Sequence, residues 1–237
     1  TLHDVSRAGL ILLAHDTMRI GASVSPPEGG ERDVSWLEQT LLTDLSPDGG
    51  TLLFTEFGEG GGPRYSASLR PADGGPAVTL GSGFATAFAA DGKQVLSFGP
   101  SASVGLGLVP TGTGPTTPVA IDPIVALSWA GFTSGGKSFL VAGADESQGV
   151  RLWHVTTANG PARAISPPGV DARFSSGVPS PDGRTVAVAM DDGDLLFCSV
   201  EGGEPRRLAT SPRALVPIAW IDEGRQLLAF ARNVPAA

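Results

Sequence analysis

The sequence predicts an all-β fold, namely a β-propeller with about six blades, five complete and four-stranded and one partial and two-stranded. Three observations predict it: a turn ending in glycine recurs six times, an apolar run follows each turn, and the turns are evenly spaced. The final glycines are Gly9, Gly49, Gly92, Gly136, Gly183 and Gly224, at intervals of 40, 43, 44, 47 and 41 residues. A period in the low forties, with a turn and a strand in every unit, is typical of propeller blades.

The turns carry the chemistry of tight hairpins. Residues 46–49 and 180–183 both read Ser-Pro-Asp-Gly. Proline presets φ near −65°, aspartate accepts hydrogen bonds from nearby backbone, and the final glycine supplies a positive φ. We therefore assign the aspartates of these turns a structural role and no catalytic one.

The strands follow from the residues on either side of the turns. The third and fourth residues after each final glycine are apolar in all six units, which predicts second strands buried on both faces. Third strands are expected at 65–69, 150–155 and 195–200. The shorter, more polar segments 77–80, 162–165 and 206–209 suit outer edge strands, where charge and proline discourage pairing with other chains.

One domain with six units covers the chain. We place the blades at about 1–36, 37–81, 82–122, 123–169 and 170–211, with a partial blade at 212–237. The partial blade would contain strands 216–220 and 226–231, wedged between the first and fifth blades with an open edge or an oligomer contact. Because the chain begins at one blade's first strand and ends after another's second, we expect a fragment of a longer protein.

Composition limits the function classes. The net charge of −8 argues against a nucleic-acid-binding surface, and the densest basic cluster, Arg206, Arg207 and Arg213, is interpreted as a solubility feature. The apolar stretches are too short for membrane insertion by this segment. Cys198, the single cysteine, is interpreted as a small buried apolar residue.

No catalytic, cofactor or metal site is predicted. The chain has no Gly-x-Ser-x-Gly elbow and no phosphate-binding loop. Its histidines are His3, His15 and His154; the first two could be neighbours on adjacent strands, but they are too few for an imidazole site. Residues 191–194 superficially resemble a calcium loop without the spacing of an EF-hand.

Carboxylates gather in the connections between second and third strands, which propeller symmetry places on one face of the disc. They are Asp16, Glu56, Glu59, Asp145, Glu146, Asp191, Asp192 and Asp194. This pattern predicts an acidic binding face for a protein or peptide partner with basic groups. The alternative is that they are ordinary solvated turn residues.

Four tryptophans leave two interpretations open. Trp36, Trp129, Trp153 and Trp220 could form a ligand-stacking set or could pack between blades. We favour the core for Trp129 and Trp153.

Several stretches resemble known propeller families. Residues 180–188 (Ser-Pro-Asp-Gly-Arg-Thr-Val-Ala-Val) and 201–208 (Glu-Gly-Gly-Glu-Pro-Arg-Arg-Leu) resemble a TolB-type, WD40-like blade. Residues 150–155, with Asn159-Gly160, also resemble a WD40 blade, with His154 where aspartate is usual. Residues 2–62, through 2–9, 31–37 and 44–49, resemble the propeller that follows the kinase domain in some bacterial eukaryotic-like serine/threonine kinases.

These resemblances imply a non-enzymatic scaffold for protein or ligand binding, such as a sensor domain of a kinase-like or TolB-like protein. They also favour a periplasmic or extracytoplasmic location. The alternatives are a propeller enzyme of lactonase, lyase or glycosidase type with a central-channel site, and a purely structural fragment whose neighbouring domains do the work. The few polar residues on the first strands argue against the enzyme.

Overall fold

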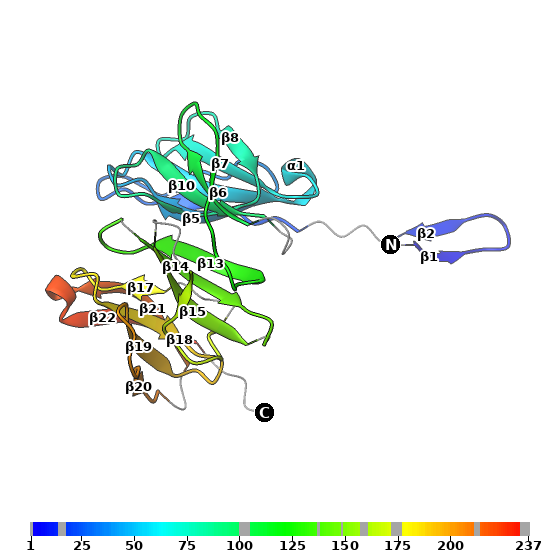
Figure 1. Cartoon of the computed structure of the whole chain (residues 1–237). Helices are drawn as coiled ribbons and strands as arrows, with labels where there is room; N and C mark the ends of the chain where they lie inside the picture. Colours follow the sequence, from blue (N-terminus) through cyan, green and yellow to red (C-terminus); the bar gives the residue numbers. More distant parts are fainter. Residues whose placement is uncertain are drawn as a thin grey trace.

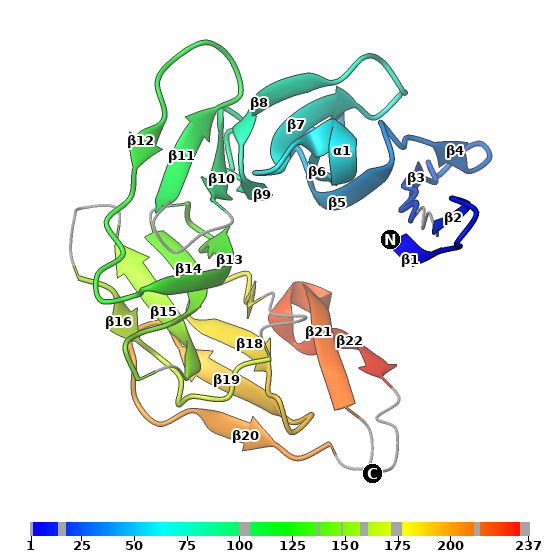
Figure 2. The ribbon, with the colours of Figure 1, turned by 90° about the vertical axis from the view of Figure 1, so that its right-hand side faces the viewer.

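The structure is a computed structural model that describes residues 2–13, 18–99, 105–136, 138–147, 149–156, 161–171, 177–210 and 214–232. Apart from two single turns, α1 (Gly58–Gly61) and the 3-10 turn η1 (Asp222–Gly224), every regular element described is a β-strand. The sheets stand one after another around an open ring (Figures 1 and 2). The predicted propeller of about six blades is confirmed.

Four sheets are complete, with four antiparallel strands each in chain order. Blade 2 contains β5 (Gln39–Leu45), β6 (Thr51–Phe57), β7 (Ser66–Pro71) and β8 (Val78–Ser82). Blade 3 contains β9 (Phe84–Phe88), β10 (Gln94–Phe98), β11 (Leu106–Pro110) and β12 (Thr117–Pro118). Blade 4 contains β13 (Ala126–Phe132), β14 (Ser138–Ala144), β15 (Val150–Thr156) and β16 (Arg163–Ala164). Blade 5 contains β17 (Val178–Pro179), β18 (Thr185–Ala189), β19 (Leu195–Ser199) and β20 (Arg206–Leu208). Outer strands such as β8, β12 and β20 lie at the rim of the ring (Figure 2).

The last unit is the predicted partial blade. Its strands β21 (Ala214–Ile221) and β22 (Gln226–Arg232) form a two-stranded sheet that packs on β17, β18 and β19 of blade 5. Arg232 of β22 donates a hydrogen bond to the buried carboxylate of Asp171 at 3.0 Å, which ties this sheet to the connection that leads into blade 5.

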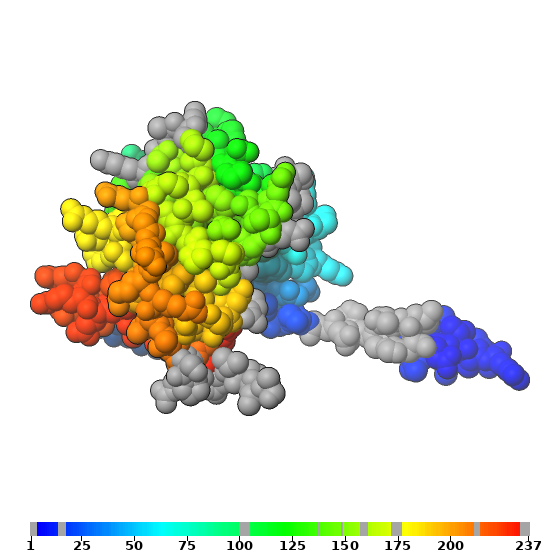
Figure 3. All heavy atoms as spheres, turned by 60° about the horizontal axis from the view of Figure 1, so that its bottom comes forward, coloured from blue at the N-terminus to red at the C-terminus, as the bar shows by residue number. Residues whose placement is uncertain are grey.

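The first unit was predicted to be a complete four-stranded blade, and the structure does not show one sheet there. Its described residues form two separate hairpins, β1 (Leu2–Val5) with β2 (Ile11–Leu13), and β3 (Ser23–Val24) with β4 (Arg32–Asp33). The described part of the chain therefore holds four complete blades rather than five. The physical reason is that the β1–β2 hairpin stands clear of the ring (Figures 1 and 3), so β2 has no partner besides β1 among the described residues.

Residues 18–36 nevertheless belong to the ring. Ile20 pairs with Gln39 of β5 in a parallel bridge. Arg70 of β7 donates hydrogen bonds to the carbonyl oxygens of Val34 and Ser35 at 2.8 and 2.6 Å. Its guanidinium lies 5.4 Å from the ring centre of Trp36. These contacts fasten the second half of the first unit to blade 2.

Each Ser-Pro-Asp-Gly turn is closed by its own serine and aspartate. In the turn before β18, the Ser180 hydroxyl donates to Asp182 Oδ1 at 2.5 Å and accepts from the Thr185 N–H at 3.0 Å. The Arg184 N–H also donates to Asp182, at 3.0 Å. The hydrogen bonds from Ser180 and from the Arg184 backbone lower the pKa of Asp182. The turn at Ser46 repeats this arrangement.

Neighbouring turns touch around the ring. A Cβ placed on the final glycine of one turn would lie 3.2 to 3.8 Å from the second residue of the preceding turn. The pairs are Pro47–Gly92, Ala90–Gly136, Ser134–Gly183 and Pro181–Gly224. Because Gly183 also has a φ of +69°, it satisfies the turn and this close approach together.

The core lies between blades rather than inside one. One cluster joins Leu96 and Phe98 of blade 3 to Val141 and Trp153 of blade 4, and a second joins blade 4 to blade 5. Trp153 is a core residue as predicted, and its indole N–H donates to the Gly143 carbonyl at 2.9 Å. The predicted core position of Trp129 is also confirmed, since it packs against the second cluster.

Cys198 behaves as predicted for a small buried apolar residue. Its side chain is fully buried in the cluster between blades 4 and 5, and burial raises the pKa of the thiol to about 12. The thiol therefore stays protonated at neutral pH.

The Ser180–Asp182 bond predicts a pH-dependent stability. A lowered pKa in the folded state stabilises the protein above the ordinary aspartate pKa near 3.8, and this stabilisation is lost as the pH falls through the folded value. Ser180→Ala should therefore raise the pKa of Asp182 and reduce the free energy of unfolding more at pH 6 than at pH 3. NMR titration of the Asp182 carboxyl and urea unfolding at the two pH values measure this. In an Asp182→Asn background the effect of Ser180→Ala should be the same at both values, and a pH-dependent difference there would contradict the assignment.

Candidate functional site

Carboxylates of the connections between second and third strands have unequal surroundings. Asp16 lies outside the described residues. The others follow β6, β14 and β18, apart from Glu56, which lies within β6. One of them is buried, two are ion-paired, three are exposed, and Asp145 is half-buried.

Glu56 is buried and so does not contribute to the predicted acidic face. Its side chain has no solvent exposure, and it accepts hydrogen bonds at 2.8 Å from the Gln39 N–H and from the Thr40 hydroxyl. The Thr40 hydroxyl in turn accepts from the Trp36 N–H at 2.9 Å. Glu56 therefore holds the segment that leads into blade 2, a structural role that its place in the sequence pattern does not reveal.

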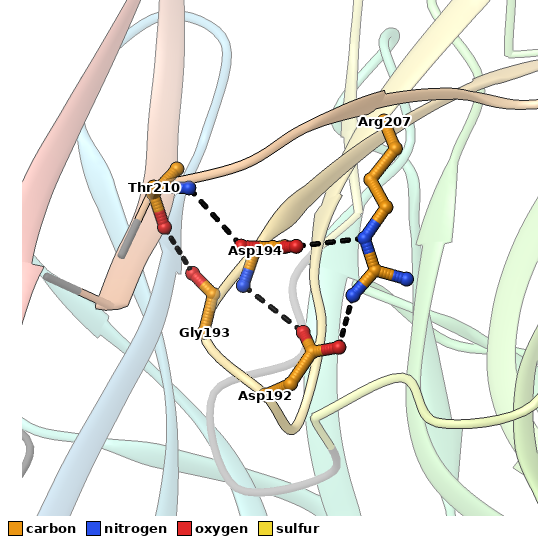
Figure 4. A network of polar contacts seen from close by, with 5 residues as sticks. All are labelled: Asp192, Gly193, Asp194, Arg207 and Thr210. Atoms are coloured by element: carbon orange, nitrogen blue, oxygen red, sulfur yellow. Dashed lines mark hydrogen bonds and ion pairs between the residues drawn. The ribbon is translucent and has the colours of Figure 1, made fainter. Parts of the chain in front are cut away.

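Asp192 and Asp194 form an ion pair with the outer strand of their own blade (Figure 4). Arg207 donates to Asp194 Oδ2 at 2.7 Å and also contacts Asp192. The Thr210 N–H donates to Asp194 Oδ1 at 3.0 Å, and the Thr210 hydroxyl donates to the Gly193 carbonyl at 2.7 Å. The Arg207 hydrogen bond, followed by the Thr210 N–H, lowers the pKa of Asp194. These two carboxylates therefore fix the hairpin, and the shared Arg207 compensates one of their two negative charges.

The exposed group consists of Glu59, Glu146 and Asp191. Asp145 is half-buried, and its carboxylate accepts hydrogen bonds from the hydroxyl and N–H of Ser147, which lower its pKa. An acidic face made by these residues stays a prediction.

Among the described residues, no three His, Cys, Asp or Glu side chains lie close enough together to hold a metal ion. His15 lies outside the described residues, so its pairing with His3 stays untested. His154 is half-buried, and its Nε2 shares a hydrogen bond with the Ser138 hydroxyl at 2.8 Å. Burial, with a smaller contribution from Arg163, lowers the pKa of His154, so the ring is neutral at pH 7.

A groove of about 430 Å³ lies between blade 5 and the partial blade, at the end of the strands where the Ser-Pro-Asp-Gly turns lie. Its aromatic floor contains Phe197 of β19 and Trp220 of β21, with ring centres 6.0 Å apart in an edge-to-face arrangement. The Trp220 indole N–H donates to the Val178 carbonyl at 2.9 Å, which fixes the ring against blade 5. Both rings remain partly exposed.

Charged residues surround this floor. Three carboxylates line the groove, from Asp182, Glu204 and Glu223, together with the guanidinium of Arg206. The Arg206 guanidinium lies over the Phe197 ring, 4.2 Å from its centre. Three carboxylates and one guanidinium give the lining a net charge of −2 at neutral pH.

Pseudo-symmetry supplies a second groove for comparison, between blades 2 and 3, with a volume of about 370 Å³. There Leu69 occupies the position of Phe197, and Phe88 that of Trp220. Its lining has two carboxylates, from Asp48 and Asp91, and no arginine. The groove beside blade 5 thus has two aromatic rings where the comparison groove has one, and four charged groups where that groove has two, although both linings have a net charge of −2.

The groove was not predicted from the sequence, although two of its residues carried signals. Trp220 was left open between stacking and packing, and Arg206 was interpreted as a solubility feature. The structure places both in the groove, whereas Arg207 pairs with the aspartates and Arg213 lies outside the described residues.

Glu223 lies at the groove in a strained conformation. It and Asp222 both have a φ of +54°, a region that residues with a Cβ rarely adopt. The Asp222 side chain supports this turn by accepting hydrogen bonds from the side chains of Arg225 and Gln226. The turn therefore presents the Glu223 carboxylate at a conformational cost.

These sheets and turns define the class of protein: the chain is a β-propeller, and its fold is similar to that of TolB. TolB from Acinetobacter baumannii is 16% identical over 90% of this chain and 59% of that chain, with a TM-score of 0.63. An oligogalacturonate lyase in complex with manganese is 16% identical over 92% and 68%, with a TM-score of 0.63. A nidogen/laminin complex gives 10% identity over 85% and 76%, with a TM-score of 0.61.

At these identities the likeness shows the fold alone. The chain spans 59% of the length of the Acinetobacter TolB. No protein-family model and no curated protein matches the sequence. No helix in the described part of the chain is long and apolar enough to cross a bilayer.

The burial of Glu56 predicts a stability difference between two neighbouring glutamates. Glu56→Ala should lower the free energy of unfolding by about 1–3 kcal/mol, because it leaves the half-buried Gln39 N–H and the buried Thr40 hydroxyl without their acceptor. The exposed Glu59 is the matched control, and Glu59→Ala should change the free energy of unfolding by less than about 0.5 kcal/mol. Urea unfolding of both variants measures this. Equal effects would contradict the structural role of Glu56.

The strain at Glu223 predicts a stabilising substitution. Glu223→Gly should raise the free energy of unfolding by about 1 kcal/mol, because glycine adopts the left-handed conformation without a Cβ clash. Thermal unfolding of the variant measures this. Glu223→Ala is the control, since it removes the carboxylate and keeps the Cβ, and it should not stabilise. A lower stability for the glycine variant would contradict the strain.

Proposed function

We propose that this chain is a non-enzymatic propeller module that binds a protein partner, and that the groove beside blade 5 holds a basic peptide segment of that partner. The observation that carries the proposal is the combination, in one groove, of two partly exposed aromatic rings with three carboxylates. Aromatic faces and carboxylates are the two groups that attract a guanidinium or ammonium ion most strongly.

The groove already contains an example of the interaction that it would offer. Arg206 lies over Phe197 at cation–π distance, so this ring accepts a guanidinium within the protein itself. An incoming arginine or lysine would meet Glu204 and Glu223, for which no hydrogen bond or ion pair is found among the described residues, and the partly exposed ring of Trp220. The net charge of −2 in the lining and −8 in the chain would steer basic segments toward it, and salt would weaken this.

The exposed carboxylates Glu59, Glu146 and Asp191 belong to the other end of the strands. They are a second, separate place at which a basic partner could bind, as the sequence predicts. None of the grooves described above combines these three carboxylates with aromatic rings. We therefore propose the groove beside blade 5 as the place where the peptide segment binds.

Two alternatives are kept as predictions. A sensor role beside a kinase domain depends on the resemblance of residues 2–62 alone. A propeller enzyme with a central-channel site is tested by metal analysis of the purified protein, since a stoichiometric bound metal would favour it.

Peptide binding tests the proposed site. The probe is a fluorescein-labelled nonapeptide of alternating arginine and glycine with a central phenylalanine, compared with the same peptide carrying glutamate in place of arginine. The arginine peptide should bind, and the combined Glu204→Gln and Glu223→Gln variant should weaken its binding about three- to tenfold, because each lost charge at a solvated rim contributes up to about 1 kcal/mol. Fluorescence anisotropy at low and physiological salt measures this.

Matched controls locate the binding. Asp91→Asn removes a carboxylate from the comparison groove between blades 2 and 3, and the pair Glu146→Gln with Asp191→Asn removes two from the other end of the strands. Neither control should weaken peptide binding beyond the small effect of a lower overall negative charge. The salt dependence of binding measures the size of that general effect. Equal binding of both peptides, or loss confined to Glu146→Gln with Asp191→Asn, would refute the groove.

A further inference from the structure

The first repeat has the sequence of a buried second strand but not its burial. In the four complete blades, the third and fourth residues after the final glycine are at most 4% exposed. They are Leu52, Leu53, Val95, Leu96, Phe139, Leu140, Val186 and Ala187. The equivalent residues of β2, Leu12 and Leu13, are 60% and 66% exposed. The same pattern is therefore buried in four units and solvated in the first.

The last repeat also has apolar side chains that no neighbouring sheet covers among the described residues. Leu228 and Phe230 are alternate residues of β22, so they share one side of the strand, and they are 47% and 43% exposed. On β21, Ile218 and Ile221 are also exposed. The opposite side of this sheet packs on blade 5, through Trp220 against Phe197. The partial blade thus presents an apolar side that lacks a neighbouring blade among the described residues.

The last unit and blade 2 lie on the two sides of one gap in the ring (Figure 2). Figure 2 shows the ring open between β22 and β5. On the other wall of this opening, Leu45 of β5 is 48% exposed. Uncovered apolar side chains therefore occur on the hairpin and on both walls of the opening, and contiguous apolar surface of this kind marks an interaction site.

We propose that the β1–β2 hairpin folds back into this opening and closes the ring, with one face on the β21–β22 sheet and the other on blade 2. Strand β2 is apolar on both faces, since Leu12 points to one side and Ile11 and Leu13 to the other. A strand of this kind requires cover on both sides, and the opening offers an apolar wall on each.

The chain's own hairpin fits this opening better than that of a second copy. Residues 14–19 connect Leu13 to Ile20, which is paired with β5 at the opening. A connection of this length holds the two within about 25 Å of each other. Tethering over such a distance gives an effective concentration in the millimolar range, far above that of a second molecule in dilute solution.

A disulfide tests the closed ring directly. Leu12→Cys with Leu228→Cys in the 237-residue chain should form an intramolecular disulfide on mild oxidation, because both side chains would face each other across the closed interface. Cys198 is buried, so it does not compete. Non-reducing electrophoresis and mass spectrometry of the linked peptides identify the product. Leu12→Cys with Val78→Cys is the control, since Val78 is exposed on the outer strand β8 and should not cross-link. A disulfide-linked dimer, or no disulfide, would overturn the proposal.

A second measurement does not depend on the cross-link. Leu12→Asp should lower Tm by several degrees if the hairpin is docked, and should leave Tm unchanged if the hairpin stays as solvated as its 60% exposure indicates. Leu228→Asp should lower Tm too. The variant with both substitutions should lose less Tm than the sum of the two single losses, because both residues belong to one interface. Val78→Asp should have no effect. Unchanged Tm values, or a mass that doubles with concentration in light scattering, would refute closure within one chain.

Discussion

The structure depends on one constraint: the second strand of each unit is apolar on both faces and needs a sheet on either side. Leu140 and Val186 satisfy it, since both lie in the cluster shared by blades 4 and 5. Each of the three core clusters found among the described residues spans two neighbouring blades, as expected of a repeat architecture in which a unit is stabilised by its neighbours. The constraint also explains why exposed apolar side chains occur on the second strands of the first and last units, at Leu12 and Leu228, while the equivalent residues of the four complete blades are buried.

The contacts between turns give the packing of the blades a repeated surface feature. In four of the six units the final glycine lies against the preceding turn, and grooves lie beside two of these pairs of turns. The groove is therefore a product of the ring and recurs with it. Its chemistry depends on a few residues that the repeat leaves free, such as Phe197 in one groove and Leu69 in another. A propeller can acquire a ligand preference in this way without any change in the fold.

The repeat could be predicted from the sequence because its signals are local. Glycine at the end of each turn and the apolar run after it specify a hairpin wherever they occur, and Trp153 follows as core from the same pattern. The first unit has these signals as well, yet Leu12 is solvated, because a local pattern specifies the hairpin and not the neighbouring sheets that would cover it. Glu56 and Arg206 escaped prediction for a related reason: their partners lie in segment 36–40 and on strand β19, which no sequence period connects to them.

The carboxylates show why a count of acidic residues does not define a binding face. Glu56 receives two hydrogen bonds in the interior, and Asp194 is compensated by Arg207, so neither offers a charge to a partner. A carboxylate attracts a cation strongly only where its own partners do not already satisfy it and where nearby apolar surface reduces the screening by water. Glu223 meets both conditions, because a strained turn holds it at the edge of an aromatic groove. The strain itself supports this interpretation, since a purely structural turn would be more stable with glycine or asparagine at that position.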